Sequence, residues 1–219
     1  MSIKIQVLDN ILSFNDTCAK ENRELFDENN VYVINLMSSP GAGKTTLLEK
    51  TLERIGTEGV AVIEGDIQTT RDSERLNQFG IPIIQINTGS ACHLDGQMIR
   101  NAIKEIELYS TRLLIIENVG NLVCPAEFRV GEHDKIAILS VTEGEDKPLK
   151  YPLMFRESSV LILNKIDLLP YLDFNIDEAI KNARQINPTL TIFPMSCKTG
   201  EGLDLWINWL QSKLNSTTG

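Results

Sequence analysis

The chain has 219 residues, of which 42% are hydrophobic and 23% are charged. This composition is that of an ordinary globular protein, and it argues against a disordered or disulfide-stapled chain. The formal net charge is −9, so the chain has no overall positive field for binding nucleic acid or an anionic membrane, and it favours cationic partners such as metal ions.

The four cysteines, at positions 18, 92, 124 and 197, lack the close pairing that indicates a disulfide framework. The first ten residues lack the pattern of a signal peptide, and no apolar run is long enough to span a bilayer. We therefore expect a soluble cytoplasmic protein with reduced thiols, with neither nucleic acid nor a membrane among its partners.

The predicted elements begin with a helix. Residues 9–30 are polar, with apolar side chains every three to four positions, which predicts an amphipathic helix that ends in the polar turn at 28–30. Beyond it, short apolar runs alternate with helical patterns. The runs cover residues 32–37, 60–63, 81–86, 113–116, 136–141, 160–163 and 191–193, and the helices cover about 44–55, 94–106, 176–186 and 203–214.

Short apolar runs separated by helices predict parallel strands that are buried on both faces. The predicted fold class is α/β, a mainly parallel, doubly wound sheet of about seven strands flanked by helices. We expect residues 1–30 to form a helical extension and residues 31–219 to form the main domain. Ligands of such sheets bind at the carboxyl ends of the strands.

A P-loop pattern, Ser-Ser-Pro-Gly-Ala-Gly-Lys-Thr at 38–45, follows the first predicted strand and opens a helix. Its small residues let backbone N–H groups surround phosphate oxygens at the positive end of the helix. Lys44 is expected to bind the β- and γ-phosphates, and the Thr45 hydroxyl is a candidate ligand of Mg²⁺. Ser38 occupies the position where the P-loop pattern has glycine. The candidate phosphate-binding residues are Ser39, Gly41, Ala42, Gly43, Lys44, Thr45 and Thr46.

Asn164-Lys165-Ile166-Asp167, at the end of a later strand, resembles the N-K-x-D element of GTPases. The Asp167 carboxylate is able to accept both N1–H and the exocyclic amine of guanine, a pair of donors that adenine lacks. We expect Asn164 to join neighbouring loops and the Lys165 stem to cover the base. Ser196, Cys197 and Lys198, after the last predicted strand, are candidates for the second base-contacting loop.

Two acidic residues at strand ends complete the predicted nucleotide chemistry. Asp66 opens a polar segment suited to a switch loop, and the spacing of Glu117 and Gly120 resembles the D-x-x-G motif of GTPases. Either carboxylate could hold the Mg²⁺ shell or orient the attacking water, while the Gly120 amide could contact the γ-phosphate. The candidate catalytic set is therefore Lys44, Asp66, Glu117 and Gly120, with Thr45, Asp66 and Glu117 as candidate magnesium ligands.

Cys92, His93 and Cys124 leave the carboxyl ends of strands, on the same side of the sheet as the nucleotide loops. Two thiolates and an imidazole suit Zn²⁺, Ni²⁺ or copper, although three ligands need a fourth from water or a second subunit. Scattered cysteines are often only small buried residues, and we expect this simpler role for Cys18 and Cys197. His133 lies in a charged run, where we expect it to be solvated.

Six segments together resemble one family, over a match that runs from about residue 20 to the end. They read SSPGAGKTT, EGDIQTTRD, NTGSACHLD, ENVGNLVCP, VTEGEDKPLKYP and NKIDLLP. The chain resembles the HypB GTPases, accessory proteins that help deliver nickel to NiFe hydrogenase. UreG, the urease accessory relative, carries a Cys-Pro-His metal motif that is absent here.

The resemblance implies a SIMIBI-class P-loop domain that binds GTP with Mg²⁺ and dimerises with GTP. It also implies Ni²⁺, or Zn²⁺ in its place, held at or near the dimer interface by Cys92, His93 and Cys124. A maturation protein and the hydrogenase large subunit are the implied partners. Some family members begin with a cysteine-rich or histidine-rich nickel motif. Here only Cys18 and no histidine precede His93, so we do not expect an N-terminal nickel store.

Other functions share parts of this pattern. A P-loop kinase of small molecules predicts an arginine-rich lid, whereas the arginines between residues 50 and 130 are scattered. A nucleotide-gated metal scaffold with little turnover, and a urease-type nickel accessory GTPase, remain the alternatives. Release of phosphate over many turnovers separates the scaffold from an enzyme.

Overall fold

The computed structural model describes residues 3–66, 75–89 and 91–217, with only the backbone of 3–11, 66 and 217. A seven-stranded sheet with the strand order β3-β2-β4-β1-β5-β6-β7 forms its centre, and all neighbouring strands are parallel. The strands are β1 (Tyr32–Ser38), β2 (Val60–Asp66), β3 (Ile83–Asn87), β4 (Leu113–Glu117), β5 (Asp134–Ser140), β6 (Val160–Asn164) and β7 (Thr191–Pro194).

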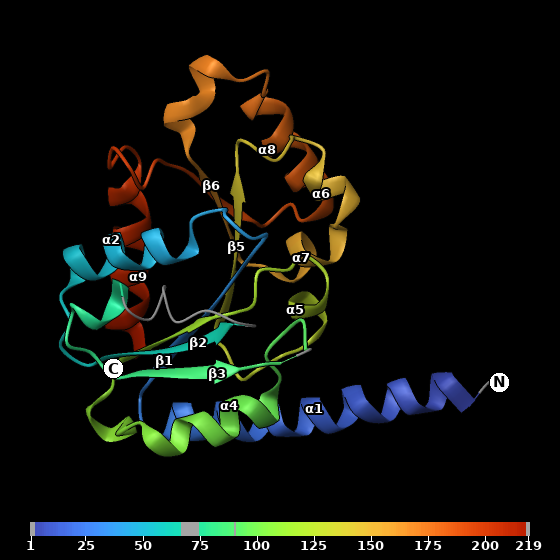
Figure 1. The fold of residues 1–219 in the computed structure, drawn as a ribbon, viewed down its shortest axis with the longest axis vertical. Helices are drawn as coiled ribbons and strands as arrows, with labels where there is room; N and C mark the ends of the chain where they lie inside the picture. The colour runs from blue at the N-terminus through green and yellow to red at the C-terminus, as the bar shows by residue number, and fades with distance from the viewer. Residues whose placement is uncertain (1–2, 67–74, 90, 218–219) are drawn as a thin grey trace.

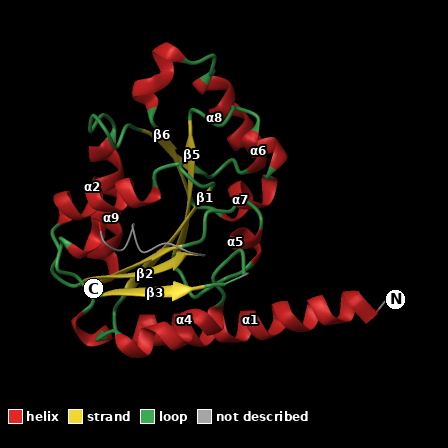
Figure 2. Ribbon diagram, viewed as in Figure 1, coloured by secondary structure: helices red, strands yellow, loops and turns green. Residues whose placement is uncertain are grey.

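Helices cover both faces of the sheet (Figures 1 and 2). The predicted α/β architecture is therefore confirmed. The α-helices of the described residues include α1 (Ile3–Glu28), α2 (Lys44–Ile55), α4 (Gly96–Ala102), α5 (Cys124–Glu127), α6 (Lys147–Lys150), α7 (Pro152–Glu157), α8 (Ile176–Ile186) and α9 (Leu203–Thr217).

The alternation of side chains along β1 shows how the two faces are filled. Ile34 and Leu36 face a core made with α2 and α9, where Trp206 is 1% exposed. Val33 and Met37 point to the other face, toward cores made with α1 and α4 and with α7 and α8. Because both faces are covered, the strands read as continuous apolar runs.

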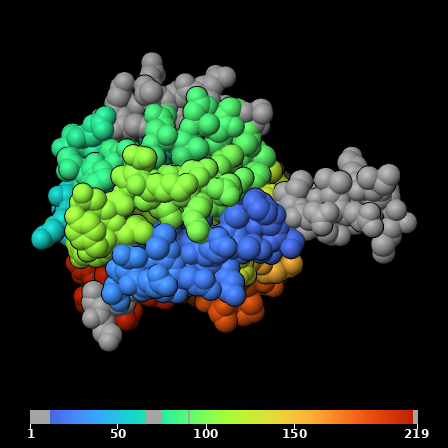
Figure 3. Space-filling model, turned by 90° about the horizontal axis from the view of Figure 1, so that it is seen from below, coloured from blue at the N-terminus to red at the C-terminus, as the bar shows by residue number. Residues whose placement is uncertain are grey.

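Helix α1 packs onto this second face beside α4 (Figure 3). Phe26 is fully buried in the core there, and Cys18 is buried as expected. The Asn22 side chain donates to the Gly96 carbonyl at 2.8 Å, and the Asn15 side chain accepts from the Gly96 amide at 2.7 Å. These bonds attach the described part of α1 to the start of α4. The boundary at residue 30 between a helical extension and the main domain remains a prediction.

Several predicted elements have different bounds in the structure, as two of them illustrate. The helix expected over 94–106 starts later, because the Asp95 carboxylate accepts from the Met98 amide at 2.7 Å and caps α4, which gives way to a 3₁₀ turn at Ile103–Glu105. The strand expected from residue 81 starts at Ile83. Among the described residues, no helix has both the length and the apolar character needed to cross a membrane.

Candidate nucleotide and metal site

A cavity of about 490 Å³ lies at the carboxyl ends of β1, β2 and β4. It is lined by the P-loop, the start of α2, the segment after β4 and one residue from the loop after β6. This is the edge at which parallel α/β sheets bind ligands. The residues that line it include Gly41, Gly43, Lys44, Thr45, Thr46, Glu64, Arg75, Glu117, Asn118, Gly120 and Lys165.

The P-loop geometry explains why serine replaces glycine at its first position. Ser38 is the last residue of β1, where extended backbone accepts any side chain, and its hydroxyl accepts from the Lys44 ammonium at 2.8 Å. Gly41 and Gly43 do require glycine, because their φ angles are 77° and 103°. A Cβ on Gly43 would lie 2.5 Å from the side-chain nitrogen of Asn164.

Acidic oxygens gather beside the first turn of α2. The Thr45 hydroxyl donates to the Glu117 carboxylate at 3.0 Å. Glu117 on β4 is paired in register with Glu64 on β2, and both carboxylates are buried and line the cavity. A hydroxyl and carboxylates are the hard oxygen donors that Mg²⁺ prefers, so this donor set fits the ion. Glu64 was not predicted from the sequence, where its only signal is a charged residue within an apolar strand.

The segment after β4 touches the P-loop directly. A Cβ built on Gly120 would lie 3.1 Å from atoms of Pro40. The loop that carries the predicted γ-phosphate contact thus lies against the P-loop, and only a residue without a side chain allows this approach without a shift of Pro40. The side chain of Asp66 and the predicted switch segment at 67–72 lie outside the described residues.

The two expected base-contacting loops lie together. The Asn164 amide donates to the Ala42 carbonyl at 2.9 Å and accepts from the amides of Lys165 at 2.8 Å and Cys197 at 3.2 Å. Asn164 therefore links the P-loop to both loops. The Ser196 hydroxyl donates to the Asp167 carboxylate at 2.6 Å.

The lysines and the cysteine of these loops differ in their surroundings. The Lys165 ammonium reaches over the P-loop to the Gly41 carbonyl at 2.7 Å, while Lys198 is exposed. Cys197 is 3% exposed, and burial raises the pKa of its thiol to about 11. A buried, protonated thiol fits the packing role expected of Cys197.

Two further side chains at the P-loop were not identified from the sequence. The Ser39 hydroxyl donates to the Glu143 carboxylate, which also accepts from the Ser140 amide at 2.9 Å. Arg75 donates to the Thr46 hydroxyl at 3.2 Å and forms a pair of bonds with a carboxylate of α2. The only sequence signals were an acid after β5 and one of several scattered arginines.

The structure brings Cys92, His93 and Cys124 together. Their ligand atoms all lie within 4.8 Å of one another, with the two sulfurs 2.7 Å apart. Cys92 and His93 belong to the loop between β3 and α4, whereas Cys124 begins α5. The His93 ring stacks on Phe128, with the ring centroids 3.9 Å apart. All four cysteines of the chain are free thiols.

The two thiols and the imidazole are donors that suit a soft or borderline divalent cation. Burial lowers the pKa of His93, which keeps the imidazole neutral and its nitrogen available as a ligand. Burial, followed by the hydrogen bond and charge of Cys92, raises the pKa of Cys124 to about 11. Two adjacent thiolates are therefore disfavoured without a cation, and a bound metal would displace their protons.

The expectation of a solvated His133 is wrong. Its side chain is 14% exposed, its Nδ1 accepts from the Val33 amide at 3.0 Å, and its Nε2 lies 2.9 Å from the Asp27 carboxylate. The charged residues beside His133 in the sequence suggest an exposed loop, whereas the fold places its side chain between β1 and α1. Burial, followed by the charge of Arg23, lowers the pKa of His133.

The parallel sheet and the phosphate loop define a P-loop NTPase fold of the SIMIBI class, with a cluster of soft metal ligands at the same edge. Residues 32–194 match the family model for the CobW/HypB/UreG nucleotide-binding domain. Over 214 residues, the chain is 51% identical to hydrogenase maturation factor HypB of Escherichia coli K12, covering 97% of this chain and 72% of that protein. The chain belongs to the HypB family of hydrogenase maturation factors.

Two solved structures place this assignment in context. The crystal structure of HypB from Helicobacter pylori in complex with nickel matches with a TM-score of 0.87 and 40% identity, covering 92% of this chain and 95% of that one. The signal recognition particle receptor FtsY from Elizabethkingia anophelis, in complex with GDP, matches with a TM-score of 0.51 and 18% identity over 88% and 70% of the two chains, and so shares the fold alone.

Proposed function

We propose that this protein is a GTP-hydrolysing nickel metallochaperone that dimerises with GTP and helps deliver nickel during the maturation of NiFe hydrogenase. One observation carries the proposal: the nucleotide cavity and the cluster of Cys92, His93 and Cys124 lie at one edge of the sheet, joined by the segment 117–124. A hydrogenase maturation partner and the hydrogenase large subunit are the recipients that this role requires.

Guanine is the base that the loops after β6 and β7 suit best. The Asp167 carboxylate is held by the Ser196 hydroxyl at 2.6 Å, and a carboxylate accepts the two adjacent N–H donors that guanine presents. Asn164 fixes this loop to the P-loop, while the stems of Lys165 and Lys198 are available to cover the faces of the base.

Hydrolysis would rest on positioning and charge. Lys44 neutralises phosphate oxygens, and the backbone amides of Ser39 and of the residues from Gly41 to Thr46 surround them at the start of α2. The Thr45 hydroxyl, with Glu117 or Asp66, would hold Mg²⁺, which neutralises the charge that develops on the phosphates when it is bound. Glu117 or Asp66 orients the attacking water.

Nickel is the cargo in this proposal, bound by Cys92, His93 and Cys124. Three ligands leave one position to be filled by water or by a second subunit. If two subunits face each other across their nucleotide sites, GTP would close the dimer and fix one arrangement of ligands. Planar four-coordinate geometry suits Ni²⁺ and tetrahedral geometry suits Zn²⁺, so a change of ligands changes the preference between them.

A second function has a specific observation in its favour. Hydrogenase/urease maturation factor HypB of Helicobacter hepaticus is 43% identical over 213 residues, covering 95% of this chain and 88% of that protein. The same nickel chemistry would therefore serve a urease as well as a hydrogenase. Nickel transfer to each apoenzyme in turn would separate the two recipients.

The test of the enzymatic claim is release of inorganic phosphate at saturating GTP and Mg²⁺, followed over several turnovers. We expect slow but multiple turnovers by the parent protein and none by Lys44→Ala. An outcome with no turnover in either protein would favour a nucleotide-gated scaffold. Equal turnover in both proteins would remove the P-loop from the reaction.

A further inference from the structure

We infer that Asn118 is a positioning residue that transmits the nucleotide state to the metal site through its side-chain oxygen. The inference deepens the proposed function and rests on it, because it concerns how a GTP-dependent change reaches the nickel ligands. It names a connection that is separate from the chain link between Gly120 and Cys124.

The position of Asn118 joins it to the nucleotide loop. It follows Glu117, whose carboxylate accepts from Thr45, and it lies two residues before Gly120. Its own backbone amide donates to the Leu36 carbonyl of β1 at 3.0 Å. The backbone of Asn118 is therefore part of the segment that would respond to the γ-phosphate.

Its side chain reaches the metal loop. The Asn118 Oδ1 atom accepts from the Leu94 amide at 3.0 Å and from the Val119 amide at 2.9 Å. Leu94 directly follows His93, and Val119 directly precedes Gly120. One oxygen atom thus connects a neighbour of the metal ligand to a neighbour of the γ-phosphate contact.

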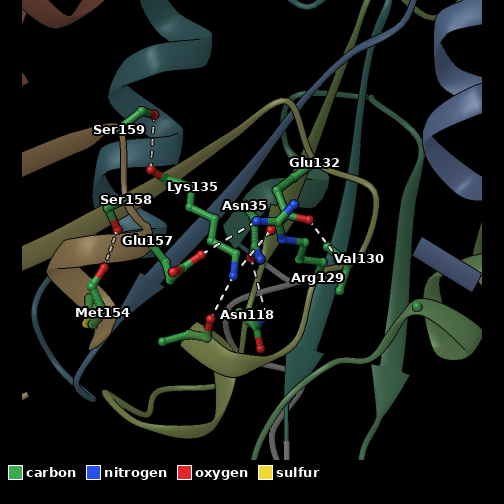
Figure 4. A network of polar contacts seen from close by, with 12 residues as sticks. Asn35, Asn118, Arg129, Val130, Glu132, Lys135, Met154, Glu157, Ser158 and Ser159 are labelled. Carbon is green, nitrogen blue, oxygen red and sulfur yellow. Dashed lines mark hydrogen bonds and ion pairs between the residues drawn. The ribbon is translucent and has the colours of Figure 1, made fainter. Parts of the chain in front are cut away.

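Burial makes this connection stiff. Asn118 is 1% exposed, and Leu94 and Val119 are also buried. Water therefore cannot readily replace the Asn118 oxygen as the acceptor for the Leu94 and Val119 amides. The Asn118 amide group also donates to the Asn35 oxygen at 3.2 Å (Figure 4), while the bonds from the Leu94 and Val119 amides hold the side-chain oxygen in place. A displacement of the 117–120 segment must either carry the Leu94 amide with it or leave that amide without its acceptor.

The three nickel ligands would follow a change at the γ-phosphate by two different routes, one for Cys124 and one for Cys92 and His93. Cys124 is four residues from Gly120 along the chain, whereas Cys92 and His93 are more than twenty residues away in sequence and respond through the Asn118 oxygen. The Cys92 and Cys124 sulfurs also touch, so this hydrogen bond is the route by which the backbone beside His93 follows the 117–120 segment.

The experiment compares Ni²⁺ affinity with GDP and with a non-hydrolysable GTP analogue, using full-length protein. Coupling of the usual size makes the two affinities of the parent differ by about 5- to 150-fold. We expect Asn118→Ala to bring this ratio to within about twofold of one. Asn118→Asp keeps an acceptor for both amides, so we expect it to retain most of the parent ratio.

Asn35→Ala is the matched control, because it removes the neighbouring amide but leaves the Asn118 oxygen on both backbone amides. We expect this variant to keep the ratio. The inference would be overturned in favour of a general packing effect by either of two results. One is a loss of the affinity ratio in Asn35→Ala as well, and the other is a loss of that ratio in Asn118→Asp. If the Ni²⁺ affinity of the parent differs between the two nucleotides and that of Asn118→Ala differs by the same ratio, the inference fails while the proposed function stands.

A second measurement applies even if Asn118→Ala does not fold. The amide signal of Leu94 in the metal-free parent, followed by two-dimensional NMR, should shift between the GDP form and the analogue form. An unchanged Leu94 signal would refute the inference. Equal nickel affinities of the parent in both nucleotide states would refute the coupled delivery and, with it, this inference.

Discussion

The substitution Asp167→Asn tests the assignment of guanine as the base. In the parent, the Asp167 carboxylate offers acceptors on both oxygens, and the fully buried Ser196 hydroxyl holds one of them at 2.6 Å. The amide of asparagine replaces one acceptor with a donor. That donor would face a guanine N–H, so one charge-assisted bond is lost and the other is weakened.

The expected loss follows from the strength of such a bond. A hydrogen bond to a charged group contributes about 1.5–3 kcal/mol, which corresponds to about a ten- to hundredfold fall in GTP affinity. The Ser196 hydroxyl limits the movement by which the side chain would recover the lost contact. Xanthosine triphosphate presents a carbonyl in place of the exocyclic amine, so its affinity should rise in Asp167→Asn.

Equilibrium titration of both nucleotides measures this exchange of preference. Ser196→Ala is the control, because it leaves the carboxylate in place and should weaken both nucleotides together without reversing the preference for GTP. If Asp167→Asn binds GTP as well as the parent does, Asp167 does not contact the base and the N-K-x-D assignment is wrong.

Three further outcomes follow from single contacts. Gly43→Ala should reduce GTP affinity by more than tenfold in a nucleotide titration, because its Cβ would lie 2.5 Å from Asn164 at a φ of 103°. Phe26→Ala should lower the free energy of unfolding by about 3–5 kcal/mol in urea, since the ring is fully buried. Burial lowers the pKa of His133, so the unfolded chain takes up the proton first, and stability should fall as the pH drops below about 6.5.

Each of these outcomes has a matched control. Gly56→Ala places alanine at a φ of 80° with nothing within 4 Å, so it should keep GTP affinity, and equal losses at the two glycines would contradict the steric argument. Phe14 is 61% exposed, and Phe14→Ala should change stability by less than about 0.5 kcal/mol. His133→Ala should lose less stability between pH 7 and pH 5 than the parent loses, and parallel curves would contradict the assignment to His133.

The strands, and the edge of the sheet that carries the site, were predictable because a strand that is buried on both faces is a continuous run of apolar residues. All five residues of β4 are buried, and the run of apolar residues ends at Glu117, where the chain reaches the cavity. The P-loop was predictable for a similar reason, since Gly41 and Gly43 have positive φ angles that few other residues adopt.

Contacts between distant segments were not predictable from local pattern. His133 has charged neighbours in sequence, yet it accepts the Val33 amide because β5 begins beside β1. The bond from the Leu94 amide to Asn118 joins residues that are 24 positions apart, and nothing in either segment indicates the partner. The gathering of Cys92, His93 and Cys124 was predicted, because all three follow strand ends on one side of the sheet, but the contact between the two sulfurs was not.

The most direct test of nucleotide-coupled nickel delivery is the reciprocal measurement of nucleotide affinity with and without Ni²⁺. The affinities of the parent for GDP and for a non-hydrolysable GTP analogue would be determined in metal-free protein and at saturating Ni²⁺, with Cys124→Ala as the control. Because coupling between two binding sites is mutual, Ni²⁺ should change the ratio of the two affinities by about 5- to 150-fold in the parent, and by much less in Cys124→Ala. A ratio that Ni²⁺ leaves unchanged in the parent would contradict the account and describe a nucleotide-binding protein with an independent metal site.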